Sequence, residues 1–280
     1  MPEVTLQRAT IDYRVLGPAD SPHPPVLFIH GILVDNRLWS KVAEELARNG
    51  FRCILPDLPL GAHRIPVADS VPLTPVTVAE MIHEFIEALD LRDVTLVGND
   101  TGGGLCQLVV DAHPDDVGRL VLTNCDAFEK FPPFPFTAVF AMIRGPWTIR
   151  LMSGLMKVPA LRRSPLGFGL LLQPGDDALT AAWVQPLRTD PRIARNLVTL
   201  LRAVEVMDLT DVATRLPGFA KPVRLVWGMA DRCFTPALGR RLAALFPNAD
   251  FVEVPGSRTF VAQDAPGAVV DAVATVGVRG

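Results

Sequence analysis

The stretch that decides the fold is residues 94–105, VTLVGNDTGGGL. A short apolar run ends at a Gly-X-Asp-X-Gly turn, and an amphipathic segment follows the turn. This order predicts a strand, a sharp turn and a helix, which together present the side chain of Asp100 at the top of a parallel sheet. Small residues are needed at Gly98 and Gly102 because the backbone is crowded there. An aspartate in this position can attack carbon to form an ester, or it can act as a base.

The composition fits one large α/β domain, or a core domain with an inserted lid. The chain has 280 residues, of which 49% are hydrophobic, so a sizeable core is expected and disorder is not. The formal net charge of −3 gives no reason to expect nucleic acid or an anionic membrane as a partner. No apolar run is long enough to span a membrane and no charged-then-apolar leader follows Met1, which favours a cytoplasmic location.

The cysteines indicate buried reduced thiols rather than a metal site or disulfides. Cys53, Cys106, Cys125 and Cys233 are scattered without metal-type spacing, and most of them lie in or beside apolar runs. No metal and no cofactor is therefore expected. The expected partner is an apolar small molecule, and a homodimer is compatible with the sequence.

Strand-like and helix-like segments alternate over residues 1–126 and again over residues 218–280. Buried strands are predicted at residues 26–29, 51–55, 94–98, 118–122, 223–227 and 251–254, after an N-terminal pair of short strands within residues 4–16. Such alternation predicts a mostly parallel sheet with helices on both faces.

Residues 127–217 interrupt this alternation. They begin with the sequence FPPFPF at residues 131–136 and continue with several helix-like apolar segments. We interpret them as an inserted helical lid. Its residues Phe134, Trp147 and Trp183 are expected to line a substrate pocket, which favours an apolar or aromatic substrate.

Four features occur together in the order of a known family. They are His30-Gly31 after an early strand, Asp100 in its turn, a lid insertion after the following strand, and the sequence GMAD at residues 228–231 after a late strand. On these residues the chain resembles an α/β-hydrolase of the haloalkane dehalogenase and epoxide hydrolase branch, over nearly its whole length. The resemblance implies the α/β-hydrolase fold, although a fold does not fix the chemistry.

The resemblance also implies roles for particular residues. Asp100 would be the nucleophile, and the backbone N–H groups of Ile32 and Thr101 would form the oxyanion hole. Asp231 would be the acid that orients the catalytic histidine, and Asp126 is a second candidate for that acid. His30 would brace the oxyanion loop rather than react.

The histidine of that family is missing from its expected place. The loop after the last strand is PGSRTF at residues 255–260, where the family's His-Phe pair corresponds to Thr259-Phe260, and no histidine follows His113. In the family this histidine activates the water that hydrolyses the aspartyl ester, so turnover through such an ester should stall. Loss of a general base typically costs about 10²–10⁴-fold in rate.

The residues that stabilise the leaving group in this branch are missing as well. Haloalkane dehalogenases of this branch hold the leaving halide with a tryptophan after the nucleophile, whereas this chain has Thr101. The related epoxide hydrolases use lid tyrosines, but the single tyrosine here is Tyr13, far from the lid.

Two residues are candidates to replace the missing base. His63 lies on a loop after a strand, at the edge of the sheet where such folds bind ligands, although a structural hydrogen-bonding role is the simpler interpretation. Asp231 could face Asp100 across a water or a substrate, and two nearby carboxylates tend to split their pKa values into an acid and a base. Thr259 would fill the space of the histidine or offer a hydroxyl to the ligand.

These observations favour an enzyme with an incomplete triad. The main hypothesis is atypical chemistry on a bulky apolar small molecule such as a secondary-metabolite intermediate. The reaction would be non-hydrolytic, a rearrangement or carbon–carbon bond chemistry, with Asp100 as base or transient nucleophile. One alternative is an epoxide, halide or ester hydrolase with His63 or Asp231 as substitute base. Another is a non-catalytic receptor for a small molecule on the same fold.

Overall fold

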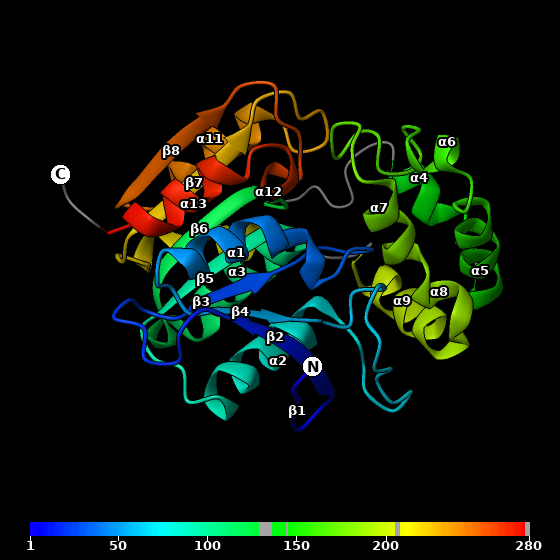
Figure 1. Cartoon of the computed structure of the whole chain (residues 1–280), viewed down its shortest axis with the longest axis horizontal. Coiled ribbons are helices and arrows are strands. Elements are labelled where there is room, and N and C mark those ends of the chain that lie inside the picture. The colour runs from blue at the N-terminus through cyan, green and yellow to red at the C-terminus, as the bar shows by residue number, and fades with distance from the viewer. Residues whose placement is uncertain (129–135, 144, 205–207, 278–280) are drawn as a thin grey trace.

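The computed structural model describes residues 1–128, 136–143, 145–204 and 208–277. Eight strands form one sheet in the order β1-β2-β4-β3-β5-β6-β7-β8 (Figure 1). Their bounds are β1 Glu3–Thr5, β2 Thr10–Leu16, β3 Val26–Ile29, β4 Cys53–Pro56, β5 Val94–Asp100, β6 Val117–Cys125, β7 Val223–Gly228 and β8 Ala249–Val254. Strand β2 pairs antiparallel with β1 and β4, and the pairings from β4 through β8 are parallel. The predicted α/β fold class is confirmed.

Strand β3 shows why helices cover both faces of the sheet. All four of its side chains are buried, with Val26 and Phe28 in one apolar cluster and Leu27 and Ile29 in the other. Successive side chains of a strand point to opposite faces, so a continuously apolar strand needs cover on both. One face carries α1 (Ser40–Arg48), α12 (Val261–Asp264) and α13 (Pro266–Thr275), and the other carries α2 (Pro75–Ala88), α3 (Thr101–Ala112), α10 (Thr210–Arg215) and α11 (Pro236–Ala243).

In the described part of the chain between β6 and α10, six helices lie together to one side of the sheet (Figure 1, green to yellow). They are α4 Phe136–Ala141, α5 Pro146–Leu155, α6 Pro159–Arg162, α7 Asp177–Val184, α8 Pro186–Thr189 and α9 Pro191–Val204. The N–H of Leu209 donates to the carbonyl of Phe128 at 2.9 Å, so the two chain segments at the base of this unit are held together. Helix α10 contacts α3, which places the last part of residues 127–217 against the core.

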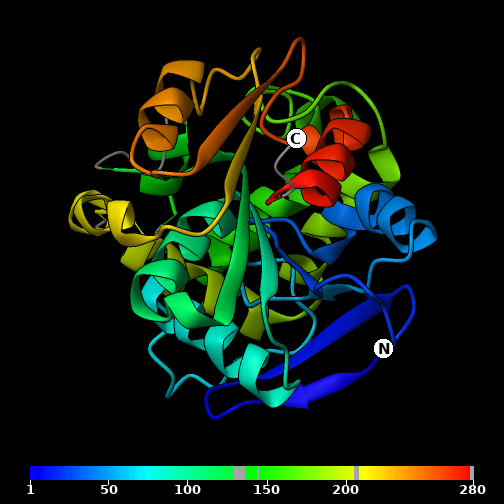
Figure 2. The same cartoon turned by 90° about the vertical axis from the view of Figure 1, so that its left-hand side faces the viewer.

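The sheet crosses the whole molecule, from the blue β1–β2 hairpin to the orange β8 (Figure 2). Asp100 ends β5, and the loops after β7 and β8 carry Asp231 and Thr259. The predicted site residues therefore come from the carboxyl ends of parallel strands, where α/β sheets bind their ligands. Among the described residues, no helix is long and apolar enough to cross a membrane.

Candidate active site

Asp100 occupies a strained turn between β5 and α3. Its backbone has φ 55° and ψ −133°, in a region that non-glycine residues rarely adopt. A Cβ on Gly98 would lie 2.7 Å from the sulfur of Cys106, and a Cβ on Gly102 would lie 2.5 Å from the carbonyl oxygens of Ile29 and His30. Both glycines are therefore required for the turn to close. Backbone strain of this kind is typical of active sites.

The His30-Gly31 loop lies directly against the carboxyl group of Asp100. A Cβ on Gly31 would be 2.3 Å from Oδ2 of Asp100. The buried ring of His30 donates from Nδ1 to the carbonyl of Gly31 at 2.9 Å and accepts the N–H of Leu58 at Nε2, also at 2.9 Å. Burial lowers the pKa of His30, so the ring is neutral and both of its nitrogens are engaged. This geometry is that of a brace for the loop.

Asp231 is held by four hydrogen bonds. Its Oδ1 accepts from the N–H groups of Cys233 (2.7 Å) and Phe234 (3.1 Å). Its Oδ2 accepts from Nδ2 of Asn124 at 2.8 Å. The hydroxyl of Thr259 donates the fourth bond, to Oδ2 at 2.8 Å. Burial raises the pKa of Asp231 to about 6, and the four donors act against this rise.

Thr259 therefore takes the contact with the acid that the family gives to its histidine. Its side chain is fully buried, and its carbonyl accepts Nδ2 of Asn99 at 2.8 Å. A hydroxyl has no basic site in the neutral pH range, so the position is filled without supplying a base. Asp231 is not among the described residues that line the cavity above Asp100.

That cavity has a volume of about 120 Å³ and lies between the sheet and the lid. Its described lining is apolar except for the side chains of Asp100, Thr101 and Ser153. The apolar lining consists of Ile32, Leu33, Phe136, Val139, Phe140, Ile143, Ile149, Met152, Met156, Leu166, Phe168, Leu171, Val184, Leu187, Leu197, Leu201 and Phe234, with Gly167 among them.

The apolar surroundings change the acidity of Asp100. Burial raises the pKa of Asp100 to about 7, the N–H of Thr101 lowers it, and the negative charge of Asp231 raises it further. Within the described lining, Asp100 is the one side chain that ionises. A carboxyl group with this pKa exchanges protons readily at neutral pH.

His63 does not reach this cavity. Its Nδ1 accepts the N–H of Gly61 at 3.2 Å, and its Nε2 contacts Oδ1 of Asn196 at 3.3 Å. The ring lines a separate polar groove, and burial lowers the pKa of His63 to about 4. All five histidines lie within the described residues, and none of them lines the cavity above Asp100. The hypothesis of a substitute base at His63 finds no support in this geometry.

Asp126 is a second buried carboxyl group next to Asp100. Neither of its oxygens has a hydrogen-bond partner, and the hydroxyl of Thr101 lacks one as well. Burial and the neighbouring charge of Asp100 raise the pKa of Asp126 well above its ordinary value. Burial therefore favours the neutral form of Asp126. Asp126 makes no described hydrogen bond to the loop that carries Asp231, so it does not take the role proposed for Asp231.

Two of the predicted pocket residues lie elsewhere. Trp147 is 66% exposed, and the residues of α5 that line the cavity are Ile149, Met152 and Ser153 instead. Trp183 is fully buried under the lid, where its Nε1 donates to Oδ1 of Asp35 at 3.1 Å. Phe134 lies outside the described residues.

The expected pocket residues did not include the four phenylalanines of the described lining, Phe136, Phe140, Phe168 and Phe234. Phe234 follows Asp231 by three residues, and Phe168 lies in the lid between two glycines. Their positions depend on tertiary packing, because neither belongs to a periodic segment that predicts its direction. The thiols of Cys125 and Cys233 are buried, and burial raises the pKa of both (that of Cys233 to about 12), which agrees with a packing role.

Comparison with known proteins identifies the family of the chain. The family model described as the alpha/beta hydrolase fold matches residues 24–265. The chain belongs to the α/β-hydrolase fold family. Within it, haloalkane dehalogenase 2 of Mycobacterium tuberculosis is 29% identical over 264 residues, which cover 89% of this chain and 86% of the relative. The predicted resemblance to the dehalogenase branch is confirmed.

Other relatives of this α/β-hydrolase carry different activities. A 2-hydroxy-6-oxononadienedioate/2-hydroxy-6-oxononatrienedioate hydrolase of Cupriavidus pinatubonensis is 26% identical and covers 88% of this chain and 84% of its own length. The solved structure of an ancestral haloalkane dehalogenase is 21% identical with a TM-score of 0.78, covering 98% of this chain and 97% of its own. An enol-lactonase from Burkholderia xenovorans is 18% identical with a TM-score of 0.72, covering 98% of both chains. The two structures show the shared fold alone. The relatives are a dehalogenase and a hydrolase, so they fit the hydrolytic alternative better than the main hypothesis of atypical chemistry.

Proposed function

We propose that this α/β-hydrolase-fold enzyme uses Asp100 as a general acid and base on an apolar small molecule with an enolisable carbonyl group. The observation that carries the proposal is the hydrogen bond from Thr259 to Asp231, in the place where the family has its histidine. Without an imidazole, an ester on Asp100 has no partner to activate water. A proton transfer at Asp100 needs no such partner.

The acidity of Asp100 suits this role. General acid–base catalysis is most efficient when the pKa of the group lies near the working pH. The pKa of Asp100 is about 7, raised by burial, so both protonation states are populated at neutral pH. The apolar cavity maintains this acidity because it offers the carboxylate few polar contacts.

The reaction also requires stabilisation of the negative charge that forms on the substrate, and the loops next to Asp100 would supply it. Asp100 would take the proton from the carbon next to the carbonyl, and the electron pair would move onto the carbonyl oxygen. The N–H groups of Ile32 and Thr101 are the proposed donors to that oxyanion, and both residues line the cavity. Asp100 would then return the proton to a different carbon, which completes an isomerisation, or to a group expelled from the β-carbon, which completes an elimination. Intermediates of secondary metabolism offer many substrates of this kind.

Deuterium exchange tests the proposal without a known product. The protein is incubated in D₂O with a panel of hydrophobic ketones and esters, and exchange of the α-hydrogens is followed by NMR. We expect the wild type to catalyse exchange on at least one compound, and Asp100→Asn to lower the rate by about 10²–10⁴-fold. The matched control is Asp250→Asn, since Asp250 is an exposed carboxylate on β8 that pairs with Arg224. Equal exchange by the wild type and Asp100→Asn would contradict the proposal.

The second candidate is hydrolysis, because the relatives include a haloalkane dehalogenase and a dienedioate hydrolase. The oxygens of Asp231 and the ring nitrogens of His63 are engaged in hydrogen bonds, so Asp100 itself would have to deprotonate the water. Multiple turnovers on haloalkanes, epoxides or esters, with no α-hydrogen exchange on the ketone panel, would favour this candidate over proton transfer.

A further inference from the structure

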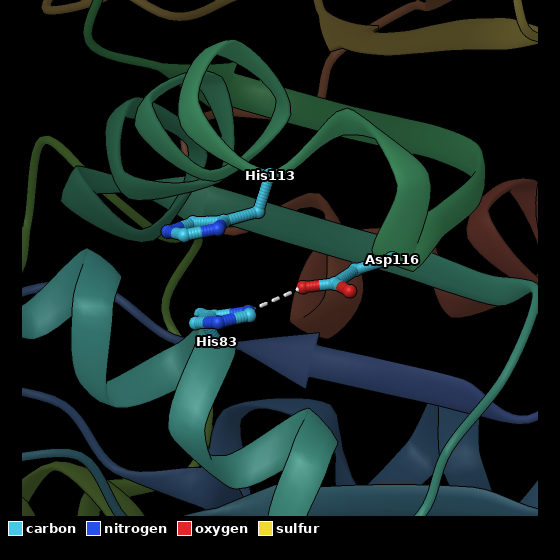
Figure 3. A group of neighbouring side chains, drawn as sticks. All are labelled: His83, His113 and Asp116. Carbon is cyan, nitrogen blue, oxygen red and sulfur yellow. Dashed lines mark hydrogen bonds and ion pairs between the residues drawn. The ribbon is translucent and has the colours of Figure 1, made fainter.

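A second group of ionisable side chains lies at the other end of α3 from Asp100. His83 comes from α2, His113 follows the last residue of α3, and Asp116 ends the short helix η2 (Pro114–Asp116). The two imidazole rings are stacked, with centroids 3.7 Å apart and planes 4° apart, and Asp116 lies beside them (Figure 3). The three side chains are 20–25% exposed, so the group is accessible to solvent.

These residues offer a set of metal ligands. One nitrogen of each imidazole and one oxygen of Asp116 lie within 4.8 Å of one another. Nδ1 of His83 and Oδ2 of Asp116 already approach to 2.6 Å. Two histidines and a carboxylate are a common donor set for Zn²⁺, which completes its tetrahedron with water.

The outer nitrogens of both rings face further carboxylates. Nε2 of His113 is 3.1 Å from Oε1 of Glu80, and Nε2 of His83 is 3.6 Å from Oε2 of Glu87. Such contacts fix the orientation of a ligating histidine and leave Nδ1 of each ring for the ion. The resulting arrangement has two imidazoles and three carboxylates, so its charge also favours a cation.

We propose that His83, His113 and Asp116 bind one divalent transition-metal ion, with Zn²⁺ as the best match. A tetrahedral zinc site separates its ligand atoms by about 3.4 Å. The ligand atoms here all lie within 4.8 Å of one another, and the pair formed by His83 and Asp116 is 2.6 Å apart, so some atoms would approach and this pair would separate. A tilt of one stacked ring provides this movement, and both rings are partly exposed to solvent. The ion would connect α2 to the turn between α3 and β6. Since α3 has 12 residues and rises about 1.5 Å per residue, this site lies about 18 Å from Asp100 and stabilises the fold without taking part in its chemistry.

Calorimetric titration of the full-length apoprotein with ZnCl₂ tests the proposal. We expect one site in the wild type. His83→Ala and His113→Ala should each weaken it at least 10-fold, Asp116→Asn should weaken it similarly, and Glu80→Gln should weaken it about 10-fold. The matched control is His23→Ala, since His23 stacks on Phe51 at the surface and contacts none of these residues. Circular dichroism of each variant checks that it is folded.

Cobalt substitution identifies the ligands independently of affinity. Co²⁺ in the proposed site should give visible absorption bands of a four- or five-coordinate ion, without the near-ultraviolet charge-transfer band of a thiolate ligand. The bands should be absent in His113→Ala and present in His23→Ala. Zinc binding that is equal in the wild type and all three ligand variants, or a wild type that binds no Zn²⁺, would overturn the proposal.

Discussion

The two ends of α3 carry opposite kinds of chemistry. At its N-terminal end, Asp100 lies under an apolar lid with two further buried carboxyl groups, Asp126 and Asp231, and no described imidazole in the cavity. At its C-terminal end, His113 and His83 lie together near the surface among carboxylates. The α/β-hydrolase family to which the chain belongs places an imidazole beside the elbow, which here is the Gly-X-Asp-X-Gly turn that carries Asp100. Here the imidazoles lie where they cannot assist Asp100.

The difference shows how a carboxyl group can take over the acidity of an imidazole. The ordinary pKa of histidine is near 6.5, which is why it serves in so many active sites. Burial raises the pKa of Asp100 to about 7, into the same range. The environment of the side chain, rather than its type, then determines which group can exchange protons at neutral pH.

Removal of one carboxylate from each region should lower the stability of the fold by very different amounts. Asp231→Ala removes the acceptor of four buried donors and should lower the free energy of unfolding by about 2–4 kcal/mol. Asp116→Ala, in the partly exposed cluster, should lower it by about 1 kcal/mol or less in metal-free buffer. Urea unfolding followed by circular dichroism measures both. Equal losses in the two variants would show that Asp231 is not the buried anchor described above.

A smaller effect comes from crowding at the elbow. In Gly31→Ala the new Cβ would lie 2.3 Å from Oδ2 of Asp100, so the carboxyl group must move. Because displacement of a reacting group by about 1 Å typically costs about 10²-fold, α-hydrogen exchange should fall by about that factor. The control is Gly267→Ala in α13, where a Cβ meets nothing within 4 Å. An unchanged exchange rate in Gly31→Ala would contradict a role for Asp100 in the reaction.

The pH dependence of stability tests the acidity of Asp100. The pKa of Asp100 is 3.8 in the unfolded chain and about 7 in the folded protein. Between these two pH values Asp100 is protonated in the folded state and ionised in the unfolded state. The contribution of Asp100 to stability is therefore full below pH 3.8 and is lost as the pH rises through 7. Asp100→Asn removes this loss and should be more stable than the wild type at pH 8 by about 4 kcal/mol, or about 7 °C in Tm. The gain should shrink at pH 5, and a gain of the same size at both pH values would refute the raised pKa.

The smallest effect concerns the lid. Trp147 is 66% exposed and lies outside the described cavity lining, so Trp147→Ala should change the free energy of unfolding by about 0.5 kcal/mol or less. The buried Trp183 provides the comparison, since its truncation to alanine should cost about 3–5 kcal/mol. Thermal unfolding of the two variants measures the difference. A large loss in Trp147→Ala would place that ring in the lid core after all.

The sequence predicted those parts of the molecule that depend on local patterns. Gly98 and Gly102 predicted the elbow, and the structure shows the close contacts that require them. The missing histidine was visible directly, and the hydroxyl of Thr259 on Asp231 matches the predicted position. The alternation of strands and helices predicted the sheet.

The remaining features depend on residues that are distant in sequence. Helix α5 has apolar side chains on two faces, with Leu151 exposed and Met152 in the cavity, so its pattern does not reveal which face is inside. The hydrogen bond that occupies Nε2 of His63 is made with Asn196, which is 133 residues away in the sequence. The cluster of His83 with His113 and Asp116 depends on the packing of α2 against α3, which no local spacing indicates.

The central claim is that Asp100 works without an aspartyl ester that water hydrolyses. The most direct measurement is incubation of the protein with haloalkanes, epoxides and esters in H₂¹⁸O, followed by mass spectrometry of the peptide that contains Asp100. Hydrolysis of an aspartyl ester would leave ¹⁸O in the carboxyl group of Asp100. We predict no ¹⁸O in Asp100 of the wild type, and accumulation of the label in Thr259→His, where an imidazole can approach Asp231. Accumulation of ¹⁸O in wild-type Asp100 would contradict the claim.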